Sequence, residues 1–143
     1  MSTRETPQIK TTRHRVLIVD DEESMRLFLA RILATGLKLE VTLAGTCEQA
    51  LRLAGNYVYD AILLDLMMPG IGGFEVLREI RQASPNIGTP VIIVSALTDQ
   101  ATRERCVRSG ANAYVAKPVE RNMLVSTVKA QIAGRGRPKG AGK

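Results

Sequence analysis

The sequence predicts one α/β domain, built on a doubly wound sheet of five parallel strands with five helices distributed over both faces. Five short apolar runs alternate with five amphipathic segments, which is the pattern of repeated βα units. The length of 143 residues suits a single domain. Aromatic residues make up only 3% of the chain and Trp is absent, so aliphatic side chains must supply the core. A base-stacking platform for nucleic acid is therefore disfavoured.

The strands are predicted where aliphatic and β-branched residues run together. Their expected bounds are 15–19, 40–43, 61–64, 91–94 and 113–116. The segments between them have helical period. The apolar stripes are Met25, Leu29, Ile32 and Leu33 in the first helix, Val76, Leu77 and Ile80 in the third, and Leu124, Val125, Val128 and Ile132 in the fifth.

Local signals mark where these elements begin and end. In chain order they are Gly36 after the first helix, Thr46 and Gln49 with capping-box spacing at the start of the second, Ser84-Pro85 after the third, Thr89-Pro90 before the fourth strand, and Gly110 after the fourth helix.

Basic charge is concentrated at the two ends of the chain. The net charge is +6, with +3 in residues 1–15, +4 in residues 135–143 and −1 in the remainder. We expect a flexible basic segment over 1–13, the folded domain over 14–133, and a flexible basic tail over 134–143. Residues 135–139 look like the core of an AT-hook, although one copy is weak evidence. DNA is expected as a partner only through this tail, if at all.

The cysteines and the apolar runs indicate the compartment. Cys47 and Cys106 are too few for a disulfide framework or a zinc site, and the N-terminus lacks the apolar stretch of a signal peptide. No apolar run approaches the roughly 18 residues that span a bilayer. We expect a cytoplasmic protein without a membrane partner, in which Cys106 packs as a small hydrophobe.

Polar side chains follow four of the predicted strands. Asp20 and Asp21 follow the first, Asp65 the third, Ser95 the fourth and Lys117 the fifth. In open α/β sheets ligands bind at this edge. The carboxylates favour Mg²⁺, with Mn²⁺ as a possible substitute, and the backbone carbonyl of residue 67 is placed to complete the ligand set.

A carboxylate beside such a metal can attack phosphorus when the phosphoryl oxygens are neutralised and aligned. Lys117 supplies a point charge for those oxygens, and Ser95 supplies a hydroxyl donor. The predicted product is an aspartyl phosphate at Asp65.

At this point the chain resembles the receiver domain of two-component response regulators over residues 14–133. The resemblance rests on Val-Leu-Ile-Val-Asp20-Asp21-Glu22, on Asp65-Leu-Met-Met-Pro69-Gly70, on Ser95-Ala96, and on Gly110-Ala111 followed by Tyr114 and Lys117-Pro118. It implies the flavodoxin-like strand order 2-1-3-4-5 and a cis Lys117–Pro118 peptide.

The resemblance also implies a function. Asp65 would take a phosphoryl group from a sensor histidine kinase or phosphotransfer protein, with Asp20, Asp21 and Asp65 around Mg²⁺. Ser95 would then move toward the phosphate and Tyr114 would follow inward. The surface of the fourth helix, fifth strand and fifth helix would change for an unknown downstream protein. A monomer and a phosphorylation-promoted homodimer both remain open.

Two positions are expected to set the lifetime of the phosphate. In receivers the residues two past the phosphorylated Asp and two past the Ser influence attack by water. Here they are Met67 and Leu97, and neither can orient a water molecule. The sequence therefore predicts slow loss of the phosphate.

Four alternatives remain beside a stand-alone receiver. A haloacid dehalogenase type phosphatase would want a second acid where Met67 stands, and a flavin-binding module would want a phosphate cradle where Asp20-Asp21-Glu22-Glu23 stands. A degenerate receiver would bind partners without phosphotransfer. The chain could also be the receiver part of a longer DNA-binding or enzymatic regulator.

Overall fold

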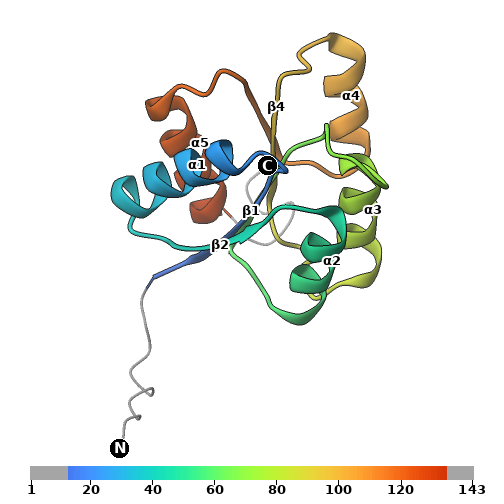
Figure 1. Ribbon diagram of the computed structural model, residues 1–143, viewed down its shortest axis with the longest axis horizontal. Helices are drawn as coiled ribbons and strands as arrows, with labels where there is room; N and C mark the ends of the chain where they lie inside the picture. The colour runs from blue at the N-terminus through green and yellow to red at the C-terminus, as the bar shows by residue number, and fades with distance from the viewer. Residues whose placement is uncertain (1–12, 135–143) are drawn as a thin grey trace, which may run out of the picture.

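Five parallel strands form the central sheet in the order β2-β1-β3-β4-β5. Figure 1 shows the sheet with helices on both sides of it. The computed structural model describes residues 13–134. The elements are β1 (Arg15–Val19), α1 (Glu23–Gly36), β2 (Glu40–Ala44), α2 (Cys47–Asn56), β3 (Ala61–Leu64), α3 (Gly73–Ala83), β4 (Val91–Ser95), α4 (Gln100–Arg108), β5 (Ala113–Ala116) and α5 (Arg121–Gly134). The predicted fold class and strand order are confirmed.

The strand bounds agree with the apolar runs to within one residue. β2 and β4 each continue one residue further than predicted, to Ala44 and Ser95. Every residue of β3 and β4 is buried, because strands covered on both faces carry apolar side chains at consecutive positions. Because β4 continues to residue 95, Ser95 is the last residue of this strand rather than the first residue after it.

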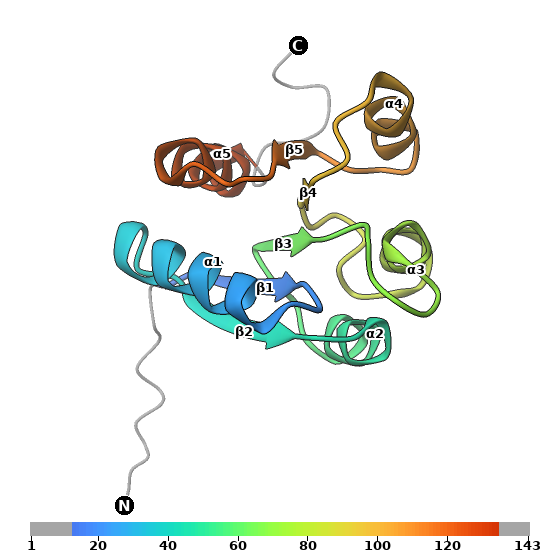
Figure 2. The same cartoon turned by 45° about the horizontal axis from the view of Figure 1, so that its top comes forward.

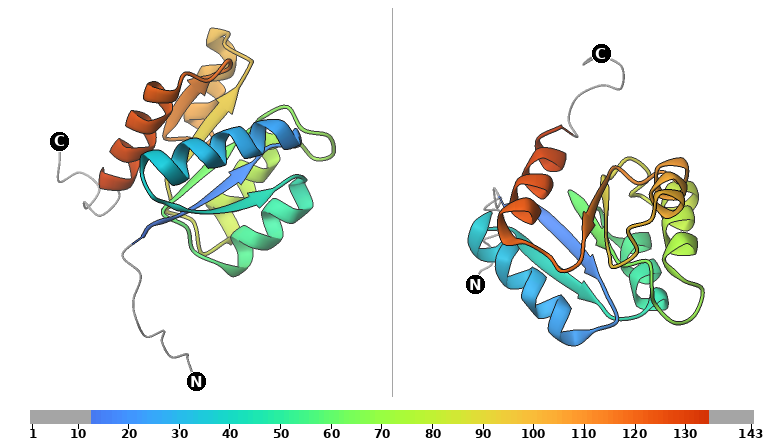
Figure 3. Two further views of the ribbon diagram at one scale, coloured as in Figure 1. Left: turned by 60° about the vertical axis from the view of Figure 1, so that its left-hand side comes forward. Right: turned by 90° about the horizontal axis from the view of Figure 1, so that it is seen from above.

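Helices cover both faces of the sheet. Helices α1 and α5 lie side by side on one face, and α2, α3 and α4 lie on the other (Figures 2 and 3). The alternation of side chains along β1 divides the core in two: Leu17 and Val19 join the cluster under α2 and α3, whereas Val16 and Ile18 join the cluster under α1 and α5.

The predicted cap of α2 is confirmed, with one difference. Thr46 Oγ1 accepts a hydrogen bond from the backbone N–H of Gln49 at 3.0 Å. The Gln49 side chain reaches back to the N–H of Gly45, at 2.9 Å, and not to that of Thr46. The loop between β2 and α2 is therefore closed by a reciprocal pair of bonds that begins one residue earlier than in a capping box.

The two helix-ending glycines play different roles. Gly110 has a φ of +104° just after α4, which is the left-handed conformation that favours glycine. Gly36 is instead the last residue of α1, and the left-handed residue of that turn is Lys38, with a φ of +56°. A Cβ on Gly36 would lie 3.1 Å from Val125 Cγ2. The small size of Gly36 thus serves the contact of α1 with α5.

Several sequence predictions fall at or beyond the ends of this structure. Most of the segment 1–13, most of the tail 134–143 and the AT-hook-like residues 135–139 lie outside the described residues. Within them, Gly134 still belongs to α5. None of the helices in the described part is long and apolar enough to cross a membrane. The Lys117–Pro118 peptide is cis, as the resemblance implied.

Candidate functional site

The polar residues that follow the strands lie at one edge of the sheet. Backbone hydrogen bonds continue the ladder past the strand ends: the N–H of Asp65 donates to the carbonyl of Val19 at 2.9 Å, and the N–H of Lys117 donates to that of Ser95 at 2.9 Å. Parallel strands in register bring their carboxyl ends together. The backbone pairing of the sheet therefore fixes the Cα positions of these residues at one edge.

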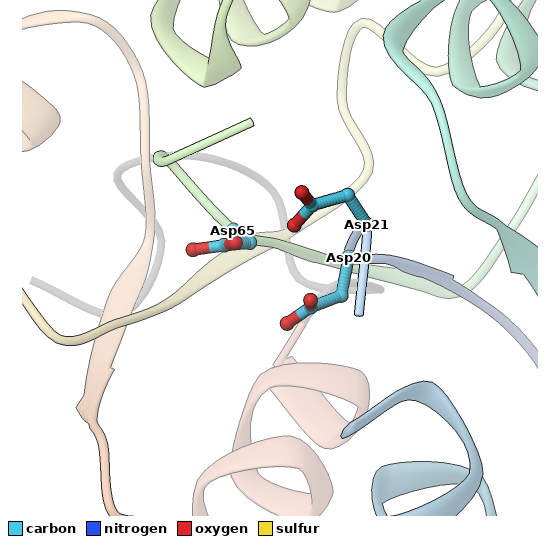
Figure 4. Close-up of side chains that lie close together, drawn as sticks. All are labelled: Asp20, Asp21 and Asp65. Atoms are coloured by element: carbon cyan, nitrogen blue, oxygen red, sulfur yellow. The ribbon is translucent and has the colours of Figure 1, made fainter. Parts of the chain in front are cut away.

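Three carboxylates meet at this edge. One oxygen from each of Asp20, Asp21 and Asp65 lies within 4.8 Å of one from each of the others, and Figure 4 shows Asp20 and Asp21 next to Asp65 from the neighbouring strand. Asp20 is 1% and Asp65 4% exposed, whereas Asp21 is exposed to solvent. Three such negative charges repel one another, and a cation bound among them would offset this repulsion.

Lys117 provides the one side-chain cation within ion-pair distance of this group in the described part of the chain. Its Nζ lies 2.9 Å from Asp20 Oδ2 and 3.8 Å from Asp65 Oδ2. Burial alone would lower the pKa of Lys117, but the hydrogen bond to Asp20 and the attraction of Asp65 outweigh burial and raise the pKa. The ammonium is therefore firmly charged, and the four groups together still carry a net negative charge.

The carboxyl group of Asp65 is harder to ionise than an ordinary one. Its pKa is raised from 3.8 to about 6, mainly because the group is removed from water, and the charges of Asp20 and Asp21 contribute to the rise. Lys117 and the N–H of Met67, which donates to Asp65 Oδ1 at 3.3 Å, oppose the shift. Ionised Asp65 at neutral pH thus represents an unfavourable charge that a bound cation would stabilise.

This shift predicts that Asp65→Asn stabilises the metal-free protein at pH 8. The folded state binds the Asp65 proton more tightly than the unfolded state, so the wild type loses stability as pH rises from about 4 to about 6. A rise in pKa from 3.8 to about 6 corresponds to roughly 3 kcal/mol, and screening by solvent in the open pocket reduces this to about 1 kcal/mol. Urea denaturation of both proteins at pH 8 and pH 4.5 measures the difference. A less stable variant at pH 8, or a difference that persists at pH 4.5, would contradict this reasoning.

An open pocket of about 380 Å³ surrounds these groups. Its lining residues are Asp20, Asp21, Glu22, Asp65, Met67, Ala96 and Lys117. Ser95 is not among them: it is fully buried, and its Oγ accepts a hydrogen bond from the N–H of Leu97 at 3.1 Å. The structure therefore brings the predicted acids, residue 67 and the lysine together around the pocket. Ser95 is buried and does not line the pocket.

Tyr114, on β5, packs against the core and against a residue of α4. Its hydroxyl is buried and makes no hydrogen bond of normal geometry among the described residues. Burial raises the pKa of the phenol, and the nearby Ser95 side chain opposes this rise. The guanidinium of Arg103 lies 4.4 Å from the ring centre. The ring therefore lies under a residue of α4 with its hydroxyl buried.

Arg26, Glu22 and Gly73 also shape this site, and of these only Glu22 belonged to a motif noted in the sequence. The Arg26 guanidinium donates to the backbone carbonyl of Asp20 at 2.8 Å, and Glu22 lines the pocket. Gly73 lies against the backbone of Asp65, where a Cβ would come within 2.6 Å of the Asp65 carbonyl oxygen. The position of Arg26, one helical turn after the acid pair, is a signal that could have indicated its contact.

The sequence was also compared with models of known protein families. The pattern described as the response regulator receiver domain matches residues 16–129. The chain belongs to this family. Receivers are signalling domains rather than enzymes of external substrates, which separates the chain from the phosphatases and flavin-binding modules weighed above.

Individual relatives show the same relationship. The DNA-binding response regulator MtrA of Mycolicibacterium smegmatis is 36% identical over 122 residues, which are 85% of this chain and 52% of MtrA. The sensory/regulatory protein RpfC of Xanthomonas campestris is 38% identical over 117 residues, which are 80% of this chain and 16% of RpfC. The receiver spans about half the length of the first relative and much less of the second.

Solved structures of other receivers superpose closely. A CheY-like receiver domain protein from Methanospirillum hungatei has a TM-score of 0.80 at 26% identity and covers 87% of this chain and 98% of its own. The receiver domain of a Pseudomonas aeruginosa sensor histidine kinase has a TM-score of 0.78 at 32% identity, with coverage of 86% and 100%. That second structure holds a magnesium ion in its active-site cleft.

Proposed function

We propose that this receiver is a phosphorylation-dependent switch in which Asp65 accepts a phosphoryl group from the phosphohistidine of a sensor histidine kinase or phosphotransfer protein. The observation that carries the proposal is the setting of Asp65. Its carboxylate is nearly buried, stands at the centre of the sheet edge between β1 and β4, and has an ammonium 3.8 Å away. The open pocket that Asp65 lines gives an external phosphoryl group access to it.

The residues present fit a divalent cation. Three carboxylates with oxygens within 4.8 Å of one another face a single lysine, and hard oxygen ligands of this kind suit Mg²⁺, with Mn²⁺ as a substitute. Asp20, Asp21, Asp65 and the backbone carbonyl of Met67 would hold the ion. When bound, it would neutralise charge on the phosphoryl oxygens.

The proposed transfer is a direct displacement at phosphorus. An oxygen of Asp65 forms a bond to phosphorus as the bond from phosphorus to the histidine nitrogen breaks, and the imidazole leaves with a proton from solvent. Lys117 stands beside both Asp20 and Asp65. It can therefore pair with a phosphoryl oxygen without leaving its place, through a charge-assisted hydrogen bond.

The response of the fold would pass through Ser95 and Tyr114. The Ser95 hydroxyl accepts a hydrogen bond from the N–H of Leu97, and on phosphorylation it would turn to donate to a phosphoryl oxygen. The buried Tyr114 hydroxyl would then rearrange with it. Since Arg103 of α4 stacks on that ring, the change would reach the surface of α4, β5 and α5. We propose this surface as the site for an unidentified downstream protein or for a phosphorylation-promoted homodimer.

Acetyl phosphate with Mg²⁺, followed by intact-mass measurement, tests this function. We expect the mass of one phosphoryl group to be added, and the addition to require the metal. An unchanged mass in every condition would favour a receiver used only as a binding platform. Continued release of phosphate from a generic ester, over many equivalents per protein, would favour a phosphatase instead.

The residues around the pocket predict that the phosphate is lost slowly. Met67, whose side chain is 57% exposed at the pocket rim, and Leu97 have no group that could orient a water molecule. A Met67→Glu variant places a carboxylate there, and we expect first-order decay of the phosphorylated form to become about tenfold faster. Loss of the added mass over time measures the decay.

Met123 on α5 offers a matched control, because it is also a methionine with 57% exposure. Met123→Glu adds the same charge away from the pocket and should leave the decay unchanged. Rapid decay in the wild type, or equal acceleration by both variants, would show that residue 67 does not limit the reaction.

The extent of the switch within the chain is also part of the proposal. We place the receiver at residues 14–133, in the cytoplasm, with the flanking segments 1–13 and 134–143 outside it. The greater length of MtrA and RpfC is compatible with an output carried by a longer protein. DNA contact, if present, would be expected through residues 134–143.

A further inference from the structure

A second pocket lies between α3 and α4, on the side of the sheet that these helices cover. Its volume is about 440 Å³, within the range of roughly 300 to 1,000 Å³ that is usual for small-ligand sites. It shares no lining residue with the acidic pocket at the strand ends. We refer to it as the α3–α4 cleft.

The charge of the α3–α4 cleft is strongly positive. Four arginines and one glutamate line it, which gives a net charge of +3. The glutamate, Glu75, is already paired with Arg78. Arg105 and Arg108 are exposed and have no carboxylate within ion-pair distance in the described part of the chain. Two guanidinium groups are therefore free to bind an anion.

Arg81 gives the cleft a fixed positive wall. Its guanidinium donates to the carbonyls of Gly110 and Ile87, both at 2.9 Å, and to Asn112 Oδ1 at 2.8 Å. Burial lowers the pKa of Arg81, yet an arginine keeps its charge in proteins. Its partners are all neutral, so this half-buried charge has no compensating anion among the described residues.

One wall of the cleft is apolar. The Arg105 guanidinium lies 3.8 Å from the centre of the Phe74 ring, and a cation above a ring is held in place by the ring quadrupole. Ile71 also lines the cleft, with 51% of its side chain exposed. Because Arg105 covers the ring of Phe74, the exposed Ile71 is the apolar surface beside the arginines that a ligand group could contact.

Helix dipoles explain only part of this arrangement. Arg81 is in the last turn of α3, and Arg105 and Arg108 are in the last turn of α4, where a cation gains about 0.3 to 1 kcal/mol. That effect favours a basic residue at each helix end separately. It does not require the side chains to line one common cavity.

We propose that the α3–α4 cleft binds a small organic phosphate of the nucleotide class. Guanidinium groups bind phosphate through paired hydrogen bonds, and the exposed Ile71 would contact the organic part. A concave cavity of this size favours a small molecule over a DNA duplex or an acidic protein, which would lie across a broader surface. The proposal does not depend on phosphorylation of Asp65.

Calorimetric titration with ADP, in the absence of Mg²⁺, tests the proposal on the full chain. We expect saturable one-to-one binding, weaker binding of inorganic pyrophosphate, and at least a tenfold loss of ADP affinity in an Arg105→Gln/Arg108→Gln double variant. Circular dichroism establishes that the variant is folded. An Arg31→Gln/Arg52→Gln variant, which removes two exposed arginines from α1 and α2, should bind ADP like the wild type.

Several results would overturn the proposal. They are no heat of binding with millimolar ADP, equal losses in both double variants, equal affinities for pyrophosphate and ADP, or binding of only an acidic peptide or a DNA duplex at these arginines. Asp65→Asn separates the two proposals, since it should abolish phosphorylation and leave ADP binding intact.

Discussion

An Asp65→Asn variant is expected to gain no phosphoryl group from acetyl phosphate under conditions in which the wild type is modified. The amide nitrogen and oxygen of Asn lack the charge and nucleophilicity of a carboxylate, and the change also replaces one of the three carboxylates of the cluster by a neutral amide. The side-chain volume hardly changes. Intact-mass measurement after incubation with acetyl phosphate and Mg²⁺ gives the result directly.

The control for this variant is Glu48→Gln, which removes one exposed carboxylate from the first turn of α2. It should be phosphorylated like the wild type. If the Asp65 variant instead gained the same mass, another side chain would have to be the acceptor, and the proposed roles of Lys117 and Ser95 would lose their basis.

A Gly73→Ala substitution is expected to destabilise the domain by about 3 kcal/mol. Gly73 begins α3, and an added Cβ would lie 2.6 Å from both the carbonyl oxygen of Asp65 and the Cα of Leu66. Both contacts are with backbone, which cannot rotate away as a side chain can. The helix must shift from the strand end, and Asp65 must shift with it, so slower phosphorylation should accompany the loss of stability.

Gly55→Ala provides the matched comparison, because a Cβ there meets no atom within 4 Å inside helix α2. Alanine should be neutral or should stabilise that helix by about 0.5 to 1 kcal/mol. Urea denaturation followed by circular dichroism measures both variants. Equal stabilities of the two would mean that the close approach of α3 to Asp65 does not constrain the fold.

The strand bounds and the edge at which the polar residues lie were predictable because they depend on local patterns. An apolar run of four or five residues, a helical stripe and a cap each depend on neighbours a few positions away. Parallel βα units then leave few topologies. The family motifs added the strand order and the cis bond before Pro118, and both are present.

The wrong or incomplete predictions involve contacts between distant segments. Gly36 was expected where the first helix ends, and it is the last residue of α1, but its close contact with Val125 was not predicted. The segment around Asn86 appeared only as a boundary between a helix and a strand. The side chain of Asn86 is fully buried. Its Oδ1 accepts a hydrogen bond from the N–H of Tyr59, and its Nδ2 donates to the carbonyls of Ala54 and Tyr57.

The sequence by itself determined the fold class, the elements and the set of groups at the sheet edge, since each follows from composition and spacing along the chain. The tertiary structure alone decided how those groups interact. The 2.9 Å contact of Lys117 with Asp20 joins residues 97 positions apart, and the raised pKa of Asp65 arises from burial by the whole fold. The arginines of the α3–α4 cleft come from two helices that meet only because both pack on one face of the sheet. Distances and burial are set by packing, and packing is not a local property of the chain.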